Sequence, residues 1–311
     1  LIASEGRLVP PAEVADAFSL MNNRYINMQS NLVQEVIAYT EQEEGSQRPR
    51  VSIIVPFYKE AFFVHHLVQM QKCAPAYVEW VWVCDDPDLV EPLRAALFNK
   101  SQMIKQQTKL VILKKNIGFS MANNIGYKYA SGDYTLLMNS DIFCHDFDWL
   151  DYSLALFDQQ NNIGAIGYSL KFEDETIQHE GMQFLRDKNY NNHYLTVHPN
   201  KGLPAKYKTL THRRVTACTA ALLLIDNDDF NDKIFSTDYV FGDFEDSHLN
   251  MELIKNGKEI LLVETPAIYH LERQSIKLLG DSAARSKITL LNCQIFNQQW
   301  SEILDVREVQ S

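Results

Sequence analysis

The sequence predicts an α/β fold in which a mostly parallel sheet is flanked by helices. From Val51 onward, short apolar runs of strand length alternate with stretches of helix length. This alternation is typical of parallel strands joined by right-handed crossovers. Polar and acidic residues stand directly after several of the runs. The chain has 311 residues, enough for one large domain with additions or for two modest domains.

The expected elements follow from the length and periodicity of the apolar runs. Strands are expected at 51–57, 78–84, 109–113, 134–138 and 163–169, with helices at 60–72, 88–100 and 120–130. Later residues predict a polar loop at 186–214, an apolar run at 219–225, a helix ending near Asn256, and strands at 259–263 and 267–271.

Both ends of the chain are predicted to be helical. Apolar residues in 12–44 recur every three or four positions, close to a coiled-coil seam. We therefore expect one long helix that mediates self-association or docks onto a neighbouring domain; packing on its own core is the alternative. The last thirty residues predict an amphipathic helix. Its expected anchors are Ile288, Leu291, Ile295 and Trp300.

Composition excludes several classes of protein. The 29 basic and 40 acidic residues give a net charge of −11, which disfavours nucleic-acid binding through a basic surface. The five cysteines are odd in number and scattered, so buried free thiols are expected rather than disulfides or a zinc site. No apolar stretch reaches the roughly 20 residues of a membrane span, and no signal peptide is visible. We expect a soluble, cytoplasmic protein, and the initial Leu1 suggests a fragment of a longer chain.

Three acidic clusters follow predicted strands or lie in adjoining loops. They are Asp85-Asp86, Asp141 and the segment 242–249. Because carboxyl ends of parallel strands share one edge of a sheet, the first two should meet where a nucleotide binds. The first predicted strand is not followed by a glycine-rich phosphate loop, so diphosphate charge would need a metal, and Asp141 could hold one. An ordinary turn at residues 139–141 is the competing interpretation.

Four blocks of sequence together resemble glycosyltransferase family 2. They are VSIIVPFYKE, VWVCDDPD, NIGFSMANNIGYKYASGDYTLLMNSD and GDFEDSHLNMELIKNGKEILLVETPAIYHLE, which span about Val51 to Glu272. The third block is similar to the branch with bacterial rhamnosyl- and galactofuranosyltransferases. The resemblance implies inverting enzymes with the GT-A fold. It places the GT-A domain at 47–275. The N-terminal helical extension at 1–46, which lies outside the family pattern, and the C-terminal helical segment at 276–311 are expected from their own residue patterns.

The resemblance also implies roles on the donor side. The nucleotide-binding residues would be Pro56, Phe57, Tyr58, Asp86, Asn116, Asn124 and Ser140. Asp141 and His270 would hold a divalent cation, Mn²⁺ or Mg²⁺. Asn139 stands where the family motif has its first acid, and it is a poorer ligand. Pro87-Asp88 replaces the usual Gly-Ser after the paired acids, so details of the base pocket do not carry over.

On the acceptor side, the resemblance makes Asp246 the catalytic base. Inversion in a single displacement requires a base that takes the proton of the acceptor hydroxyl. The partners would be a nucleotide-sugar donor and a glycan or lipid-linked glycan acceptor of a bacterial surface polysaccharide. Peripheral attachment to the inner face of the membrane would suit such an acceptor.

Each assignment has a competing interpretation from the residues alone. Asp86 suits a turn before a proline, Asn116 and Asn124 suit caps or turns, and His270 suits a partly buried strand end. The basic segment 198–214 is either a solvated loop or a flap over the acceptor or phosphate. His179 resembles a family segment beside the sugar pocket.

Two other functions also remain open from the sequence. A catalytically degenerate scaffold is favoured by Asn139 and disfavoured by the joint presence of Asp141, Asp246 and His270. A sugar-1-phosphate nucleotidyltransferase shares the α/β layout, but VPFYKEAFF lacks the glycines of its signature loop.

Overall fold

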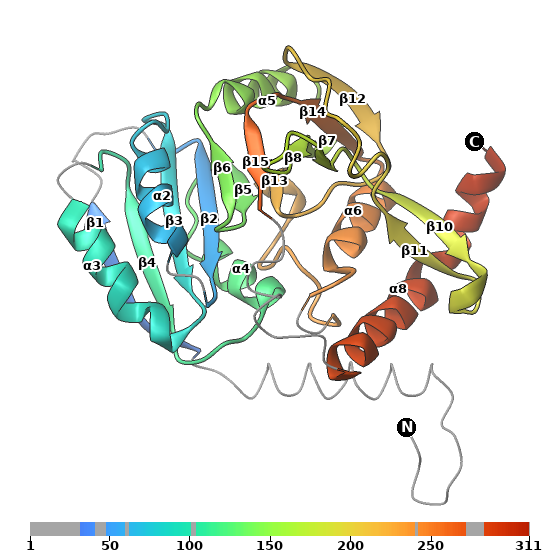
Figure 1. The fold of residues 1–311 in the computed structure, drawn as a ribbon, viewed down its shortest axis with the longest axis horizontal. Coiled ribbons are helices and arrows are strands. Elements are labelled where there is room, and N and C mark those ends of the chain that lie inside the picture. Colours follow the sequence, from blue (N-terminus) through green and yellow to red (C-terminus); the bar gives the residue numbers. More distant parts are fainter. Residues whose placement is uncertain are drawn as a thin grey trace, which may run out of the picture.

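A nine-stranded sheet forms the centre of the molecule in the computed structural model (Figure 1). The structure describes residues 32–40, 48–59, 62–100, 104–239, 242–271 and 283–310. The strand order is β1 (Val33–Thr40), β4 (Thr108–Leu113), β3 (Val78–Cys84), β2 (Val51–Phe57), β5 (Tyr134–Met138), β13 (Leu222–Asp226), β7 (Ile163–Tyr168), β14 (Glu259–Glu264) and β12 (Thr211–Val215). Only β1, β13 and β12 run against the common direction, which confirms the predicted α/β sheet.

The first half of the sheet consists of strands buried on both faces. β2 pairs in parallel with β3 and β5, and every residue of β3 is buried. Burial on both faces explains nearly continuous apolar runs such as VEWVWVC, in which Glu79 is the one polar residue. The intervening helices are α2 (Phe62–Gln71), α3 (Val90–Lys100) and α4 (Phe119–Tyr127), close to the predicted ranges.

Two apolar cores lie on opposite faces of this sheet. Ile53 of β2 belongs to one core and Ile54 to the other, as the alternation of side chains along a strand requires. Helices α2, α3 and α5 (Asp148–Gln159) contribute to the first core, whereas α4, α6 (Glu245–Lys255) and α8 (Ala283–Gln310) contribute to the second. A Cβ on Gly126 of α4 would lie 2.5 Å from Ile54 Cγ2, so this glycine permits close packing of α4 on β2.

The second half of the sheet is joined to the first by an antiparallel strand. β13 lies between β5 and β7 and is antiparallel to both. It arises from the apolar run predicted at 219–225. Helix α6 ends as predicted, with Asn256 as its cap and Gly257 in the left-handed region at φ 79°.

A smaller sheet and a hairpin complete the fold. The smaller sheet contains β6 (Ile142–Cys144), β15 (Ile268–His270), β8 (Leu170–Lys171) and β9 (Ile177–His179), in that order. The hairpin of β10 (Gln183–Asp187) and β11 (His193–Val197) lies beside α8 (Figure 1). In α8, Ile295 and Trp300 are buried as predicted, and Leu291 and Ile288 are partly buried. None of the described helices is long and apolar enough to cross a membrane.

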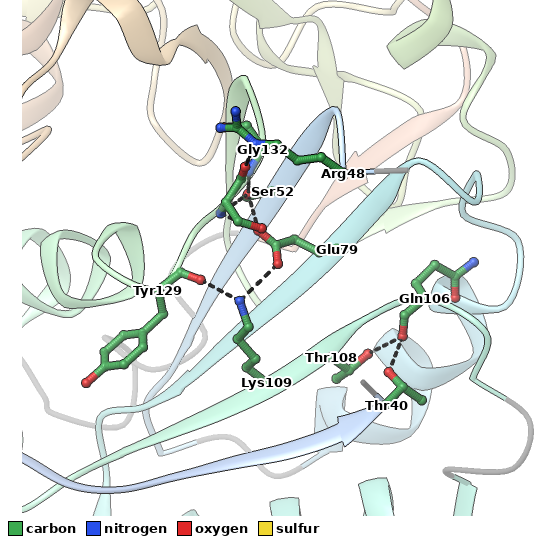
Figure 2. A network of polar contacts seen from close by, with 10 residues as sticks. Thr40, Arg48, Ser52, Glu79, Gln106, Thr108, Lys109, Tyr129 and Gly132 are labelled. Atoms are coloured by element: carbon green, nitrogen blue, oxygen red, sulfur yellow. Dashed lines mark hydrogen bonds and ion pairs between the residues drawn. The ribbon is translucent and has the colours of Figure 1, made fainter. Parts of the chain in front are cut away.

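A network of polar contacts lies at the amino ends of the central strands (Figure 2). Ser52, Glu79 and Lys109 each occupy the second position of a strand, in β2, β3 and β4. The fully buried Glu79 accepts hydrogen bonds from Ser52 Oγ at 2.6 Å and Ser131 Oγ at 2.8 Å. Lys109 Nζ lies 3.1 Å from Glu79 Oε2 and donates to the carbonyl of Tyr129 at 2.9 Å. These contacts hold the chain before β5 at the amino edge of the sheet.

The helix predicted over 12–44 is wrong in the part that the structure describes. Residues 33–40 form strand β1, antiparallel to β4, and the rest of the predicted helix apart from Leu32 lies outside the described residues. Pairing with the free edge of β4 accounts for the difference, because β-branched residues such as Val33 and Ile37 suit a strand. The sheet therefore begins before residue 47. Self-association through this region stays a prediction.

Two further predictions are wrong in detail. The expected polar loop at 186–214 contains the end of β10, all of β11 and most of β12, because these strands are largely exposed and therefore carry many polar residues. Among the cysteines, Cys84, Cys144, Cys218 and Cys293 are buried and free as expected, but Cys73 is exposed. Cys73 lies just after the end of α2, where the chain turns toward β3.

Candidate active site

Asp141 and His270 meet where two short strands pair. β6 begins directly after Asp141, β15 ends on His270, and their antiparallel pairing places His270 opposite Ile142. The Nε2 atom of His270 lies 3.2 Å from Oδ1 of Asp141. Residues 139–141 also form the turn that was the competing interpretation, since Ile142 N–H donates to the carbonyl of Asn139 at 3.2 Å. The turn thus presents the carboxylate to the strand that carries the imidazole.

This pair fits a divalent cation that draws further ligands from another molecule. Both side chains are nearly buried, and apart from the contact with Asp141 neither ring nitrogen of His270 has a hydrogen-bond partner among the described residues. The buried Oδ1 of Asn139 also has none. Carboxylate and imidazole are ligands that such ions accept. The described part of the chain contains no group of three or more His, Cys, Asp or Glu residues that could hold a metal.

Asp85 organises the loop after β4. Its carboxylate accepts hydrogen bonds from the N–H groups of Ile117 at 2.7 Å and Gly118 at 3.1 Å, and from Asn116 Nδ2 at 2.9 Å. Burial raises the pKa of Asp85 to about 7, although the two backbone hydrogen bonds oppose that rise. Asp85 therefore joins the ends of β3 and β4 and sets the start of α4.

Asp86 is the more accessible member of the acidic pair. Its Oδ1 accepts from the N–H of Asp88 at 3.0 Å and caps a short helical turn, so the turn interpretation is part of its role. Its Oδ2 accepts from the N–H of Lys59 at 3.1 Å. Of the three predicted residues at the end of β2, Pro56 and Tyr58 are partly exposed. Phe57 is fully buried 4.8 Å from the ring of Trp82, so its side chain packs in the core.

The predicted asparagines have distinct environments. Asn116 is bonded to Asp85, at the carboxyl edge of the sheet. Asn124 is buried in α4, where its Oδ1 accepts from the N–H groups of Ile234 and Phe235 and its Nδ2 donates to the carbonyl of Phe235. Asn124 therefore fixes the segment before residue 240. Ser140 is partly exposed in the turn next to Asp141. Nucleotide contact by these residues stays a prediction.

Asp246 stands in the first turn of α6, after a loop with unusual backbone geometry. Gly242, Asp243 and Phe244 all have positive φ, at 116°, 74° and 69°. Non-glycine residues with positive φ are uncommon and are concentrated at functional sites. The loop directs Asp246 toward the segment before β13, where Thr219 and the N–H of Ala220 donate to its carboxylate.

The environment of Asp246 suits a group that gains a proton. Burial raises the pKa of its carboxyl above the ordinary value, and the negative charge of Asp243 adds to the rise. Hydrogen bonds from Ser247, Thr219 and Ala220 oppose this rise, and Ser247 N–H lies 2.7 Å from Oδ1. The bonds also fix the orientation of the carboxylate. Sequence reasoning missed Thr219 and Ala220, because the apolar run at 219–225 gave no sign of a contact with α6.

The basic segment 198–214 is an ordered part of the fold. Gly202 N–H donates to the carbonyl of Ile177, so the segment lies along β9. Arg213 and Arg214 are in β12 and pair with Glu264 and Glu259 of β14, at 3.0 and 2.8 Å. These two arginines therefore stabilise the edge of the main sheet, and a phosphate-covering flap would have to use other residues.

Residues 52–232 match the family model described as "Glycosyl transferase family 2". This match covers more than half of the chain. The chain belongs to glycosyl transferase family 2. The resemblance carried by the four sequence blocks is therefore confirmed.

Two curated relatives are long proteins that the chain matches over a small part. The chain is 29% identical over 134 residues to "O-antigen biosynthesis protein RfbC" of Myxococcus xanthus, which is 43% of this chain and 10% of that protein. It is 24% identical over 184 residues to "Uncharacterized protein y4gI" of Sinorhizobium fredii (strain NBRC 101917 / NGR234), which is 59% of this chain and 20% of that protein. The chain thus spans a fifth or less of each relative.

Solved structures share the fold at low sequence identity. A mannosyltransferase of Pyrobaculum calidifontis in complex with GDP-Man and Mn²⁺ has a TM-score of 0.51 and 14% identity over 92% of this chain and 81% of that chain. TarS 1–349 of S. aureus in complex with UDP-GlcNAc has a TM-score of 0.52 and 18% identity over 80% and 67%. These similarities confirm the GT-A fold.

Proposed function

We propose that this glycosyltransferase is an inverting enzyme that moves a sugar from a nucleoside-diphosphate sugar to a hydroxyl group of a glycan acceptor. The observation that carries the proposal is the approach of Asp141 to His270 at the carboxyl edge of the sheet. Both residues come from the sequence blocks that resemble the family, and they are brought together by the pairing of β6 with β15. Similarity to an O-antigen biosynthesis protein supports a role in bacterial surface polysaccharide synthesis.

On the donor side, Asp141 and His270 would hold a divalent cation, Mn²⁺ or Mg²⁺, which would supply positive charge beside the departing nucleoside diphosphate. Because these are two ligands, further ligands would have to come from the diphosphate, and metal binding would be weak without the nucleotide. The presence of Mn²⁺ with GDP-Man in the mannosyltransferase structure supports this arrangement.

Nucleotide recognition is assigned to the adjoining strand ends. Pro56, Tyr58 and Asp86 present partly exposed groups there, and Asp85 holds Asn116 beside them. Backbone groups at the carboxyl ends of parallel strands are the usual place for a nucleotide in this type of sheet.

On the acceptor side, Asp246 is the general base. Its carboxylate takes the proton of the acceptor hydroxyl as that oxygen attacks the anomeric carbon from the face opposite the leaving group. A raised pKa makes the carboxylate a stronger base than an ordinary aspartate. The hydrogen-bond donors around the carboxylate hold it in one orientation. The acceptor is a glycan or lipid-linked glycan.

A metal-dependent binding experiment tests this function against a scaffold role, which Asn139 alone favours. The melting temperature is measured with UDP, GDP and dTDP, each with and without Mn²⁺, and a panel of sugar nucleotides is screened for hydrolysis. The enzyme should be stabilised by at least one nucleotide only when Mn²⁺ is present, and it should hydrolyse the matching donor. No response to any nucleotide would support the scaffold.

A further inference from the structure

The loop that leads into α6 is held by side chains of α8. Asn292, which is fully buried, donates through Nδ2 to the carbonyl of Gly242 at 2.7 Å and to the carbonyl of Asp243 at 3.1 Å. An amide nitrogen has two hydrogens, one for each of these consecutive carbonyl groups. Thr289, one turn earlier in α8, donates from Oγ1 to the carboxylate of Asp243 at 2.6 Å. Helix α8 thus restrains both the backbone and the acidic side chain of this loop.

The loop needs such support because its backbone conformation is unfavourable by itself. Gly242, Asp243 and Phe244 all have positive φ, and non-glycine residues keep such a conformation only where their surroundings hold them. Phe244 begins α6 without a side-chain hydrogen bond that caps the helix. Its ring packs against that of Phe296 in α8, with the centroids 5.3 Å apart. The contacts from α8 therefore help to keep the loop in its unusual conformation.

The loop in turn determines where Asp246 lies, since Asp246 is the second residue of α6. The carboxylate of Asp246 is bonded on another side by Thr219 and Ala220, which belong to the segment before β13. The charge of Asp243, the side chain that Thr289 holds, contributes to the raised pKa of Asp246. A shift of the loop would therefore change both the orientation and the surroundings of the Asp246 carboxylate.

The contacts with the loop and with α6 lie along one face of α8. The side chains that make them are three or four residues apart, at Thr289, Asn292, Phe296 and Trp300. The Nε1–H of Trp300 donates to Nδ1 of His248 in α6 at 3.0 Å, so the same face also binds the helix that follows the loop. Helix α8 lies outside residues 52–232, which match the family model. The family match therefore does not include these contacts.

We propose that α8 is part of the acceptor side of the active site, where Asn292 and Thr289 are positioning residues that hold the loop 242–244 and thereby orient the carboxylate of Asp246. This inference rests on the proposed function, in which Asp246 takes the proton of the acceptor hydroxyl. In this role α8 acts through the loop. Substitutions in α8 should then lower turnover without weakening nucleotide binding, because the donor site is assigned to other strands.

Hydrolysis of a sugar nucleotide measures this role without an identified acceptor, because water takes the place of the acceptor hydroxyl. The donor is the one that the wild-type enzyme turns over with Mn²⁺ among UDP-glucose, UDP-galactose, GDP-mannose and dTDP-rhamnose. Thr289→Val keeps the shape of the side chain but removes its hydroxyl. It should lower kcat on the order of 10-fold, as expected for a misplaced catalytic group, with little change in the Kd of the nucleoside diphosphate. Thr289→Ser keeps the hydroxyl and should recover most of the rate.

Combination with Asp246→Asn separates positioning of the base from general destabilisation. A positioning residue acts through the base, so Thr289→Val should lower the residual rate of Asp246→Asn by less than about twofold. Asn292→Leu removes both amide hydrogen bonds and should follow the same pattern. Asn297→Leu is the matched control and should keep kcat near that of the wild type. Asn297 is also a buried asparagine of α8, but its amide donates to the carbonyl of Tyr194 in β11, at 3.0 Å.

Several results would overturn the inference. They are a wild-type kcat in Thr289→Val, an equal loss of rate in Thr289→Ser, and an equal further loss in the Asp246→Asn background. A loss of rate in Asn297→Leu as large as that in Asn292→Leu would also count against it. If circular dichroism shows that Asn292→Leu does not fold, the two Thr289 variants decide. A wild-type protein that hydrolyses none of the four sugar nucleotides would contradict the proposed function itself, and the inference would be lost with it.

Discussion

Hydrogen bonds from Ser247, Thr219 and Ala220 hold the carboxylate of Asp246, which we propose takes the proton of the acceptor. We predict that Asp246→Asn reduces transfer about 10²–10⁴-fold, the usual cost of losing a general base. Donor binding should change little, because the amide keeps the shape of the side chain and the base acts on the acceptor. Transfer rates and the Kd of the nucleotide are the measurements. Asp148→Asn, an exposed first-turn aspartate of α5, is the control, and near-normal turnover of Asp246→Asn would remove this residue from the mechanism.

The raised pKa of Asp246 predicts the pH dependence of transfer. A base works only when it is deprotonated, so the rate should fall as the pH drops through its pKa. Because burial raises that pKa, the acid limb of kcat/KM should lie above the ordinary aspartate value of 3.8. The profile of kcat/KM against pH, measured with saturating Mn²⁺, checks this. An acid limb at or below the ordinary value would contradict it.

Asp141 and His270 are expected to differ in their effects on the metal. Asp141→Ala should abolish metal-dependent nucleotide binding, since it removes the only carboxylate of the pair. His270→Ala should weaken binding and shift the preference from Mn²⁺ toward Mg²⁺, which prefers oxygen ligands. Calorimetric titration of nucleoside diphosphate with each ion measures both effects. The control variant His65→Ala, at an exposed position of α2, should change neither nucleotide binding nor metal preference. If Asp141→Ala kept the metal dependence of the wild type, Asp141 would be excluded as a ligand.

At the scale of elements, the amino edge of the sheet depends on one buried carboxylate. Burial alone would raise the pKa of Glu79, but hydrogen bonds from Ser52 and Ser131 and the charge of Lys109 together lower it. Glu79→Gln removes the charge and should reduce the free energy of unfolding at pH 7 by roughly 1–3 kcal/mol, because a buried partner is left less well paired. Denaturant unfolding of both proteins measures the difference.

The sign of the pH dependence follows from the lowered pKa. A carboxyl whose pKa is lower in the folded state stabilises the protein above its unfolded-state pKa, about 4.3 for glutamate. That contribution is lost as the pH falls through the lower folded-state pKa. The difference between wild type and Glu79→Gln should therefore be full at pH 7 and shrink below about pH 4. Glu302→Gln, an exposed position of α8, should show no such trend, and a constant difference across pH would contradict the charge-based explanation.

The elements that sequence predicts well are those with both faces buried. VSIIVPF and VEWVWVC are apolar except for Ser52 and Glu79, so no other assignment competes with a central strand. β1 has one exposed face and occupies the sheet edge, and its pattern VQEVIAYT also suits a helix. Its true partner, β4, is 68 to 80 residues away along the chain, a pairing that no local pattern encodes. The hairpin of β10 and β11 is local, but it was missed because its strands are largely exposed and carry many polar residues.

For the whole site, the sequence blocks predicted individual residues but not which of these residues contact one another. Asp141, Asp246 and His270 were named from motifs, and the structure brings Asp141 and His270 together through the pairing of β6 with β15. The contacts of Thr219 with Asp246 and of His179 with His198 depend on tertiary packing between segments that are distant in the chain. Such contacts leave no periodic signal.

The last prediction concerns β1, the strand at one edge of the main sheet. β1 covers β4, packs Ile37 and Tyr39 against the core, and pairs Glu35 with Arg94 of α3. Removing residues 1–46 should therefore lower the free energy of unfolding by roughly 2–4 kcal/mol, from the lost apolar burial and hydrogen bonds. It should also promote aggregation, because β4 becomes an unprotected edge strand.

Removing residues 1–31 is the matched comparison, because it keeps β1. Denaturant unfolding and light scattering of the two truncated proteins and the full chain separate the contributions of β1 and of the preceding residues. If residues 12–31 mediate self-association, the shorter truncation lowers the mass in solution without the loss of stability seen in the longer one. Equal stability of the full chain and the protein without residues 1–46 would mean that β1 adds nothing to the sheet, since its pairing with β4 would then be energetically neutral.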